Sequence, residues 1–386
     1  MSKMRMRGGL IVYVTSHGFG HLNRSAAVIN QMASEIPVTI RCDRNLFAHW
    51  RERLRRPAEL TEYVSDAGAI NPPGNSAATD GPATLERASQ VHLKAAGLIA
   101  EEVAWLRNTG AAAVLCDAPP LPLLAAKEAG IAGFLLANFT WTEIYAPHAK
   151  RLGTDARDLV AEIRTEYRSA VEVFRAQPGL KLADFDVHKI TDVGMVVTPG
   201  RDRRPELDRL LGLNPSDKLV YFYVGRYGQS NLGWQRLEGL KAHGTHFVGF
   251  HPAPSGKVSN LHVVPAREWT GADLAASSDV IVAKAGYGTV CEAMVAGTPM
   301  IYPPRTGFAE HRALDRALKT WGGGVPASVR EFSELRIERH LEKAFALRPG
   351  RPPFPADGAA RIATRLTLAC EAVRMQIKLF PEPSKP

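Results

Sequence analysis

The chain has 386 residues, which is long for a single hydrophobic core, so two domains are expected. Hydrophobic residues make up 45% of the sequence and charged residues 23%, as in ordinary globular proteins, and no apolar run approaches the roughly 18 residues that a membrane span needs. The net charge of +9 favours an anionic ligand, an anionic membrane surface or nucleic acid as a partner.

The first predicted element is a buried strand over residues 9–15, which leads into the turn SHGFGH at 16–21 and a helix from about Asn23 to Ser34. A strand, a Gly-x-Gly turn and a helix form a ligand-binding unit, in which His17, Gly18 and Gly20 line the turn. His21 stands at the entrance of the helix, whose positive end favours the neutral imidazole that acts as a general base. The alternative is that His21 only caps the helix.

The chain continues with a strand at 38–42, a basic helical stretch at 43–56, a loop rich in Gly, Pro, Asn and Ser at 64–84, and a helix at 85–108. A strand at 112–116 then ends in Asp117, on the ligand-binding edge of a parallel sheet. Asp117 could orient the imidazole of His21, or it could cap the helix predicted at 121–129.

A further strand at 132–136 precedes Asn138, Thr140 and Trp141, which are predicted to line the same edge of the sheet. A long amphipathic helix is expected at 155–176, and a linker at 187–217. Between them lies the acidic triplet Asp184-Phe185-Asp186, a pattern that can hold a divalent metal on a diphosphate. It has no adjacent apolar strand, so no metal site is predicted.

The second half repeats the plan of the first, with strands at 218–224, 245–250 and 261–264 and a short helix at 271–277. Its central stretch predicts a strand at 280–283, a turn through Gly286 and Gly288, a helix at 289–296 and a strand at 300–302. The helix start offers unpaired N–H groups to an anion. Glu292 either forms a capping box with Thr289 or accepts two hydroxyl groups from a ligand.

These units predict an α/β protein with two doubly wound, Rossmann-like domains facing across a cleft. The expected boundaries are 1–195 for the N-terminal domain and 196–386 for the C-terminal domain. The last helix, predicted at 357–378, could pack back on the first domain.

Three motifs resemble those of glycosyltransferases with the GT-B fold: residues 16–21, the region 117–141 and the segment KAGYGTVCEA at 284–293. The similarity covers nearly the whole chain. It is strongest to the branch that holds the peptidoglycan N-acetylglucosaminyltransferase and to the glycosyltransferase-like N-terminal part of plant L-arabinokinases. The resemblance implies an enzyme of the hexosyltransferase type, in which residues 1–195 form the acceptor-side domain and residues 196–386 the nucleotide-sugar-binding domain.

The resemblance also implies roles for single residues. Glu292 would accept both ribose hydroxyls of the donor, and Thr270 would border its base, expected to be uracil. Glu310 and His311 stand where the peptidoglycan enzyme has two glutamines facing the sugar and ribose, which leaves the donor sugar open. The diphosphate would be surrounded by Gly225, Arg226, Gly286, Tyr287, Gly288 and Thr289, and Lys284 is a further donor-binding residue.

The implied reaction is an inverting, metal-independent transfer of a sugar from a nucleoside diphosphate donor to a hydroxyl acceptor, with His21 as base and Asp117 as its support. No cofactor is expected beyond the donor itself. Two alternatives stay open: a nucleotide-sugar epimerase on the same fold and a non-catalytic nucleotide-sugar-binding protein. A sugar kinase is disfavoured because the sequence up to residue 386 has no kinase-type glycine-rich phosphate segment.

The expected partners are therefore a nucleotide sugar and an unknown hydroxyl acceptor. Nucleic acid is not expected, because aromatic and basic residues are not interleaved in clusters. The four cysteines are far apart, with neither a zinc-site nor a disulfide pattern, which suits a cytoplasmic protein with possible peripheral contact to an anionic membrane.

Overall fold

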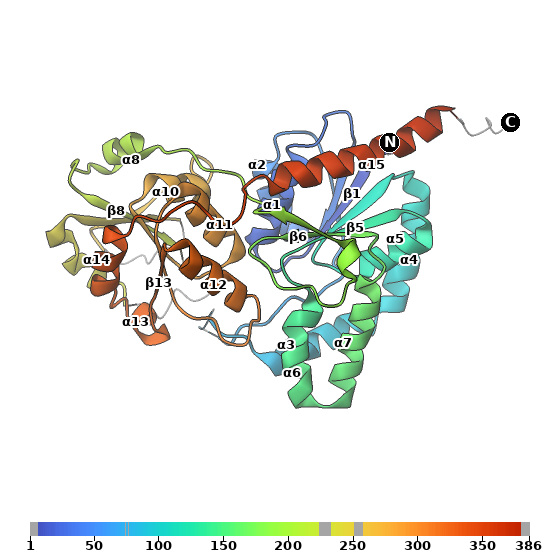
Figure 1. Cartoon of the computed structure of the whole chain (residues 1–386), viewed down its shortest axis with the longest axis horizontal. Coiled ribbons are helices and arrows are strands. Elements are labelled where there is room, and N and C mark those ends of the chain that lie inside the picture. The colour runs from blue at the N-terminus through green and yellow to red at the C-terminus, as the bar shows by residue number, and fades with distance from the viewer. Residues whose placement is uncertain (1–6, 74, 76, 224–232, 251–257, 380–386) are drawn as a thin grey trace. The chain divides into compact units, whose positions relative to one another are not determined.

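The computed structural model describes residues 7–73, 75, 77–223, 233–250 and 258–379. Contacts within the chain divide it into two compact units (Figure 1). Unit 1 comprises residues 1–70, 81–196 and 355–386, and unit 2 comprises residues 71–80 and 197–354. The last helix therefore belongs to unit 1, and ten residues of the long N-terminal loop belong to unit 2.

Unit 1 is built on a parallel sheet with the strand order β3-β2-β1-β4-β5-β6-β7. The strands are β1 Leu10–Val14, β2 Val38–Cys42, β3 Glu59–Glu62, β4 Ala113–Asp117, β5 Ala132–Ala137, β6 Glu172–Ala176 and β7 Ile190–Gly194. Every residue of β1, β2 and β4 is buried, as expected for parallel strands covered on both faces.

Helices cover both faces of this sheet (Figure 1). They are α1 Phe19–Ile29, α2 Phe47–Arg53, α3 Gly81–His92, α4 Ala95–Thr109, α5 Leu121–Ala129, α6 Trp141–Leu152, α7 Thr154–Tyr167 and α15 Gly358–Leu379. Helix α15 contacts α1 and β7, and it buries Ile362, Leu366 and Cys370. The last helix of the chain thus completes the first unit.

Unit 2 has a parallel sheet with the order β10-β9-β8-β11-β12-β13. The strands are β8 Lys218–Tyr223, β9 Thr245–Gly249, β10 Leu261–Val263, β11 Val280–Ala283, β12 Met300–Tyr302 and β13 Gly324–Pro326. The helices are α8 Arg204–Leu211, α9 Arg236–Gly239, α10 Gly271–Ser277, α11 Tyr287–Ala296, α12 His311–Trp321, α13 Val329–Ser333 and α14 Glu338–Ala346. Two doubly wound α/β units confirm the predicted fold class.

The segment 71–80 pairs with the loop that follows β12. Ala78 forms a parallel bridge with Thr306, whose N–H donates to the carbonyl of Ala77 at 2.8 Å. The N–H of Thr79 donates back to the carbonyl of Thr306 at 3.0 Å. Part of the loop predicted at 64–84 is thereby held by backbone hydrogen bonds within unit 2.

Several predicted elements were wrong. The helix expected at 155–176 ends at Tyr167, and its last five residues form β6. The helix expected at 85–108 is two helices, α3 and α4, separated at residues 93–94. The linker expected at 187–217 contains the edge strand β7 and the helix α8.

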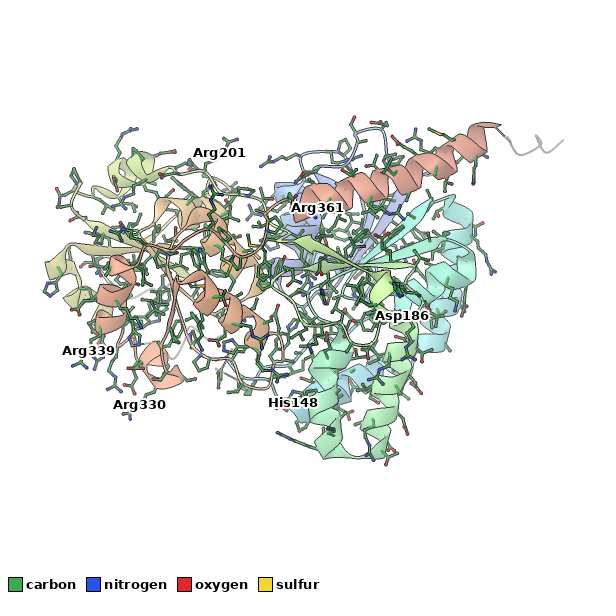
Figure 2. The ribbon with its side chains drawn as sticks, in the orientation of Figure 1. His148, Asp186, Arg201, Arg330, Arg339 and Arg361 are labelled. Carbon is green, nitrogen blue, oxygen red and sulfur yellow. The ribbon has the colours of Figure 1, made fainter. Side chains whose placement is uncertain are left out.

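The positive charge is spread over both units. Figure 2 shows Arg201, Arg330, Arg339 and Arg361 on different elements, and all four are exposed. Arg330 and Arg361 form exposed ion pairs with acidic residues four positions away in sequence. Within the described part of the chain, no helix is long and apolar enough to cross a membrane.

Candidate functional site

The first predicted ligand-binding turn joins β1 to α1. Helix α1 begins at Phe19, four residues earlier than predicted, because Gly18 adopts φ 94° and ψ 161° and ends the extended chain there. This backbone conformation strongly favours glycine. Gly18 is the N-cap residue and no side chain caps the helix, so the alternative of His21 as a cap is wrong.

His21 lies in the first turn of α1 and meets the end of β4. Its Nδ1 atom is 2.8 Å from Oδ1 of Asp117. The side chains are almost inaccessible, with 7% exposure for His21 and 0% for Asp117. Asp117 does not cap α5, whose N-cap residue is Pro120 and which has no side-chain cap. The structure therefore brings together the two predicted catalytic residues.

Arg24, which sequence reasoning missed, completes this pair. Its Nε donates to both carboxylate oxygens of Asp117, at 3.0 and 2.9 Å, and its Nη1 donates to Oδ1 of Asn138. The hydroxyl of Ser25 donates to the same carboxylate at 2.7 Å. Arg24 follows His21 by three residues and thus shares its helix face, which was the available signal.

These contacts fix the charge of Asp117. Burial alone would raise the pKa of its carboxyl, but the guanidinium of Arg24 and the imidazole of His21 outweigh burial and lower it to about 2. The group is a carboxylate at neutral pH. We name the buried set His21, Arg24 and Asp117 the charge triad.

The charge triad favours one tautomer of His21. A carboxylate only accepts hydrogen bonds, so the 2.8 Å contact requires a proton on Nδ1. Nη2 of Arg24 lies 3.0 Å from the same nitrogen and is also a donor, so the two contacts compete for Nδ1. With the proton on Nδ1, the lone pair lies on Nε2, which makes no hydrogen bond with any described residue.

The predicted acceptor-side residues have structural partners. The hydroxyl of Thr140 accepts a hydrogen bond from the backbone of Glu143 and caps α6, and Asn138 is fully buried beside Arg24. The indole of Trp141 donates to Oδ2 of Asp66 at 2.8 Å. Burial raises the pKa of Asp66, although hydrogen bonds from Thr15 and Trp141 oppose it.

The first part of the long loop is anchored to this edge. The N–H of Ala69 donates to Nδ1 of His17 at 3.2 Å, and the hydroxyl of Tyr145 donates to the carbonyl of Gly68 at 2.9 Å. The ring of His17 lies edge-on to Trp141 at a centroid distance of 5.3 Å. His17 therefore helps to position residues 68 and 69.

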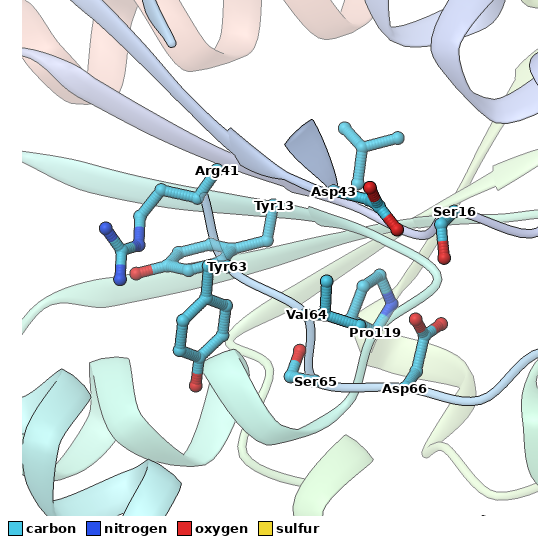
Figure 3. Close-up of a pocket in the computed structure, with 10 residues that line it drawn as sticks. Tyr13, Ser16, Arg41, Asp43, Tyr63, Val64, Ser65, Asp66 and Pro119 are labelled. Carbon is cyan, nitrogen blue, oxygen red and sulfur yellow. The ribbon is translucent and has the colours of Figure 1, made fainter. Parts of the chain in front are cut away.

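A narrow polar pocket opens beside the turn, at the carboxyl ends of the strands β1 to β4 (Figure 3). Its polar lining includes Ser16, Asp43, Ser65 and Asp66, and Figure 3 shows the carboxylates of Asp43 and Asp66 near Ser16 and Pro119. Arg41 also lines the pocket, but its charge is paired with the buried Glu102. The pocket thus presents mainly hydrogen-bond acceptors and hydroxyls.

The second predicted ligand-binding turn joins β11 to α11 in unit 2. Helix α11 begins at Tyr287, two residues earlier than predicted, with Gly286 as N-cap. Thr289 is therefore inside the helix, and the capping box between Thr289 and Glu292 is wrong. No side chain caps α11 and its first turn has no acidic residue, so its N–H groups remain suited to an anion.

Glu292 points toward the β8 side of this turn. A Cβ atom on Gly271 would lie 3.4 Å from Oε2 of Glu292 and 3.0 Å from the hydroxyl of Tyr221. Thr270, predicted to border the base, caps α10 and accepts a hydrogen bond from Asp273 at 3.0 Å. The half-buried Glu292 is thus free of the capping role that competed with ligand binding.

On the other side of the turn lie charged residues at the ends of β11 and β12. Nη1 of Arg305 is 3.7 Å from Oε2 of Glu310, and both side chains are buried. Burial lowers the pKa of Lys284 to about 8, with a further decrease from Arg305 and an opposing effect from Glu310. Burial also lowers the pKa of His311. Arg305 was not predicted, since it follows two prolines outside any motif.

Two predicted residues, Gly225 and Arg226, lie outside the described residues. The structure describes the acidic triplet at 184–186. In it, Asp184 forms an ion pair with Arg164 at 2.6 Å and accepts a hydrogen bond from Thr142. Its carboxylate therefore has a structural role in unit 1, tying α7 to the start of α6.

No protein-family model matches the chain. Over 344 residues it is 27% identical to an L-arabinokinase of Arabidopsis thaliana; the match covers 87% of this chain and 32% of that protein, so the chain spans about a third of the relative's length. The resemblance to plant L-arabinokinases is confirmed.

Solved structures of glycosyltransferases share the whole fold. The kitacinnamycin glycosyltransferase has a TM-score of 0.62 at 17% identity and covers 97% of this chain and 99% of its own. UGT2 of Phytolacca americana, complexed with UDP-2-fluoroglucose and pterostilbene, has 0.60 at 14%, covering 99% and 97%. A spinosyn rhamnosyltransferase complexed with thymidine diphosphate has 0.60 at 14%, covering 96% and 99%. The chain therefore has the GT-B fold of these glycosyltransferases.

Proposed function

We propose that the protein is a glycosyltransferase that moves a sugar from a nucleoside diphosphate to a hydroxyl acceptor with inversion at the anomeric carbon. The observation that carries the proposal is the 2.8 Å contact between His21 and the ionised Asp117 at the carboxyl edge of a parallel sheet. The Asp117 carboxylate holds a proton on Nδ1 and leaves Nε2 as the base.

The chemistry is a direct displacement. Nε2 of His21 takes the proton of the acceptor hydroxyl as its oxygen bonds to the anomeric carbon, and the bond from that carbon to the diphosphate breaks. The electron pair leaves with the nucleoside diphosphate. Asp117 then stabilises the imidazolium, as an acid does in a catalytic triad.

The donor would bind at α11. The uncapped N-terminus of this helix offers N–H groups to the diphosphate, and the charge that grows on the leaving group is stabilised there. Glu292, which does not cap α11, would accept hydrogen bonds from the ribose hydroxyls. The UDP-2-fluoroglucose and thymidine diphosphate bound by two proteins of the same fold support such a donor, with uracil and thymine as the first bases to test.

The acceptor would approach from the polar pocket of unit 1. Ser16, Asp43 and Asp66 can accept hydrogen bonds from hydroxyl groups of an acceptor. This lining suits a hydroxylated acceptor, whose reacting oxygen needs its remaining hydroxyls to be bound and oriented.

The first test is calorimetric titration of the protein with UDP, dTDP, GDP and ADP. We expect one of them to bind, and Glu292→Ala to weaken it by roughly 30-fold or more, because two hydrogen bonds to a carboxylate are lost. Glu342→Ala, an exposed change on α14, serves as the matched control and should bind like the unaltered protein.

Product analysis separates the alternatives. Conversion of the donor sugar without any acceptor would identify an epimerase, and donor binding with neither hydrolysis nor transfer would identify a non-catalytic binder. A folded protein that binds none of the four nucleotides would contradict the proposed function altogether.

A further inference from the structure

The residues around the turn between β11 and α11 lie at the ends of three neighbouring strands, in the order β8, β11 and β12. Glu292 lies on the β8 side, beside Gly271 and Tyr221. The uncapped start of α11 lies at the end of β11, and Arg305 and Glu310 lie beyond the end of β12. If Glu292 holds the ribose and α11 the diphosphate, as the proposed function requires, then the sugar extends toward Arg305.

The region around Arg305 carries more positive than negative charge. Lys284 and Arg305 are near enough to repel each other, and Glu310 is the carboxylate near both. Lys284 is half-buried, and its ammonium group forms no hydrogen bond or ion pair within the described residues. Arg305 is 9% exposed, and its Nε makes no hydrogen bond within the same residues.

Arg305 is also fixed in place. Its guanidinium lies over the ring of Phe308 at 3.6 Å, and Glu310 is 3.7 Å from Nη1. A buried guanidinium costs free energy unless its donors are satisfied. A rigid, partly unsatisfied guanidinium beside a lysine is suited to bind two oxygens of one anionic group.

We propose that Lys284 and Arg305 bind a carboxylate on the sugar of the donor, so that the enzyme takes a nucleoside diphosphate uronic acid. The inference rests on the proposed function and specifies its donor. The surplus positive charge is one reason for it. The other is position: the diphosphate has its own partners in the N–H groups of α11, whereas Arg305 lies one strand further along the sheet.

The experiment compares the affinities of UDP-glucuronate, UDP-galacturonate, UDP-glucose and UDP by calorimetry. If dTDP is the nucleotide that binds, its corresponding sugars are used instead. At least one uronate should bind about tenfold or more tightly than the glucose donor, since a charge-assisted pair is gained. In Arg305→Gln this preference should fall to about twofold or less, while the affinity for UDP alone stays unchanged.

Two further variants keep the result interpretable. Lys284→Met should reduce the same preference, and Arg316→Gln, an exposed change on α12, should not. Unchanged affinity for UDP shows that Arg305→Gln leaves the donor site folded. Equal loss of UDP, glucose-donor and uronate binding would assign the two cations to the diphosphate and overturn the inference.

The two proposals fail differently. Binding of UDP without any preference for a uronate contradicts the inference and leaves the proposed function intact. Absence of binding by every nucleotide and nucleotide sugar contradicts both.

Discussion

Replacing His21 with alanine is expected to lower turnover by at least about 100-fold and to leave the affinity for the donor nearly unchanged. Nε2 of His21 is the proposed base, and the donor is proposed to bind in unit 2 through other residues. Release of nucleoside diphosphate in the presence of hydroxyl acceptors measures turnover, and calorimetry measures donor affinity.

The control is His188→Ala, which alters an exposed histidine of the same unit. It should retain the turnover of the unaltered protein. Parallel losses of turnover and donor affinity in His21→Ala would mean that His21 binds the donor or supports the fold, and the assignment as base would then fail.

Arg24→Met is expected to destabilise the protein by about 3–5 kcal/mol, since it leaves the carboxylate of Asp117 buried without its cation. Arg24 is 3% exposed and donates to both oxygens of that carboxylate. Urea denaturation at pH 7 measures the free energy of unfolding. Arg44→Met removes an exposed ion pair with Glu62 and should cost only about 0.5 kcal/mol.

The double variant Arg24→Met with Asp117→Asn should recover part of the lost stability, because no unpaired charge remains buried. A double variant less stable than Arg24→Met alone would show that Arg24 stabilises by packing and not through the charge of Asp117.

The same pair predicts a pH dependence. The pKa of Asp117 is lowered to about 2 in the folded protein, below the ordinary value of about 3.9. Its contribution to stability is therefore fully present above about pH 4 and is lost as the pH falls toward 2. The difference in stability between Arg24→Met and the unaltered protein should shrink over this range.

The local signals in the sequence predicted the two strand–turn–helix units well. The buried strands before residues 16 and 284 were predicted from continuous apolar runs, and both glycine turns followed from spacing. Asp117 was expected at the ligand-binding edge of the sheet, where it could orient His21, and the structure places its Oδ1 atom 2.8 Å from Nδ1 of His21. The roles of the donor-site residues stay predictions.

Other features had no local signal. Strand β3 is an edge strand with one apolar residue and no buried one, and β6 follows a helix in an unbroken amphipathic run, so neither shows the apolar pattern of a central strand. Asp66 lies in a loop, and its partner Trp141 is 75 residues away in the sequence. Arg305 also lies in a loop, where no motif points to it. Because glycine is the N-cap residue of both α1 and α11, each helix begins nearer to its turn than predicted.

Helix α15 has a consequence for the synthesis of the chain. A ribosome completes β7 long before it reaches Gly358, so the surfaces of α1 and β7 that α15 covers stay open while residues 197–354 of unit 2 are made. At 5–20 residues per second this interval is roughly 10–30 s. The nascent N-terminal unit is therefore the part of the molecule that most needs a chaperone to protect it from aggregation.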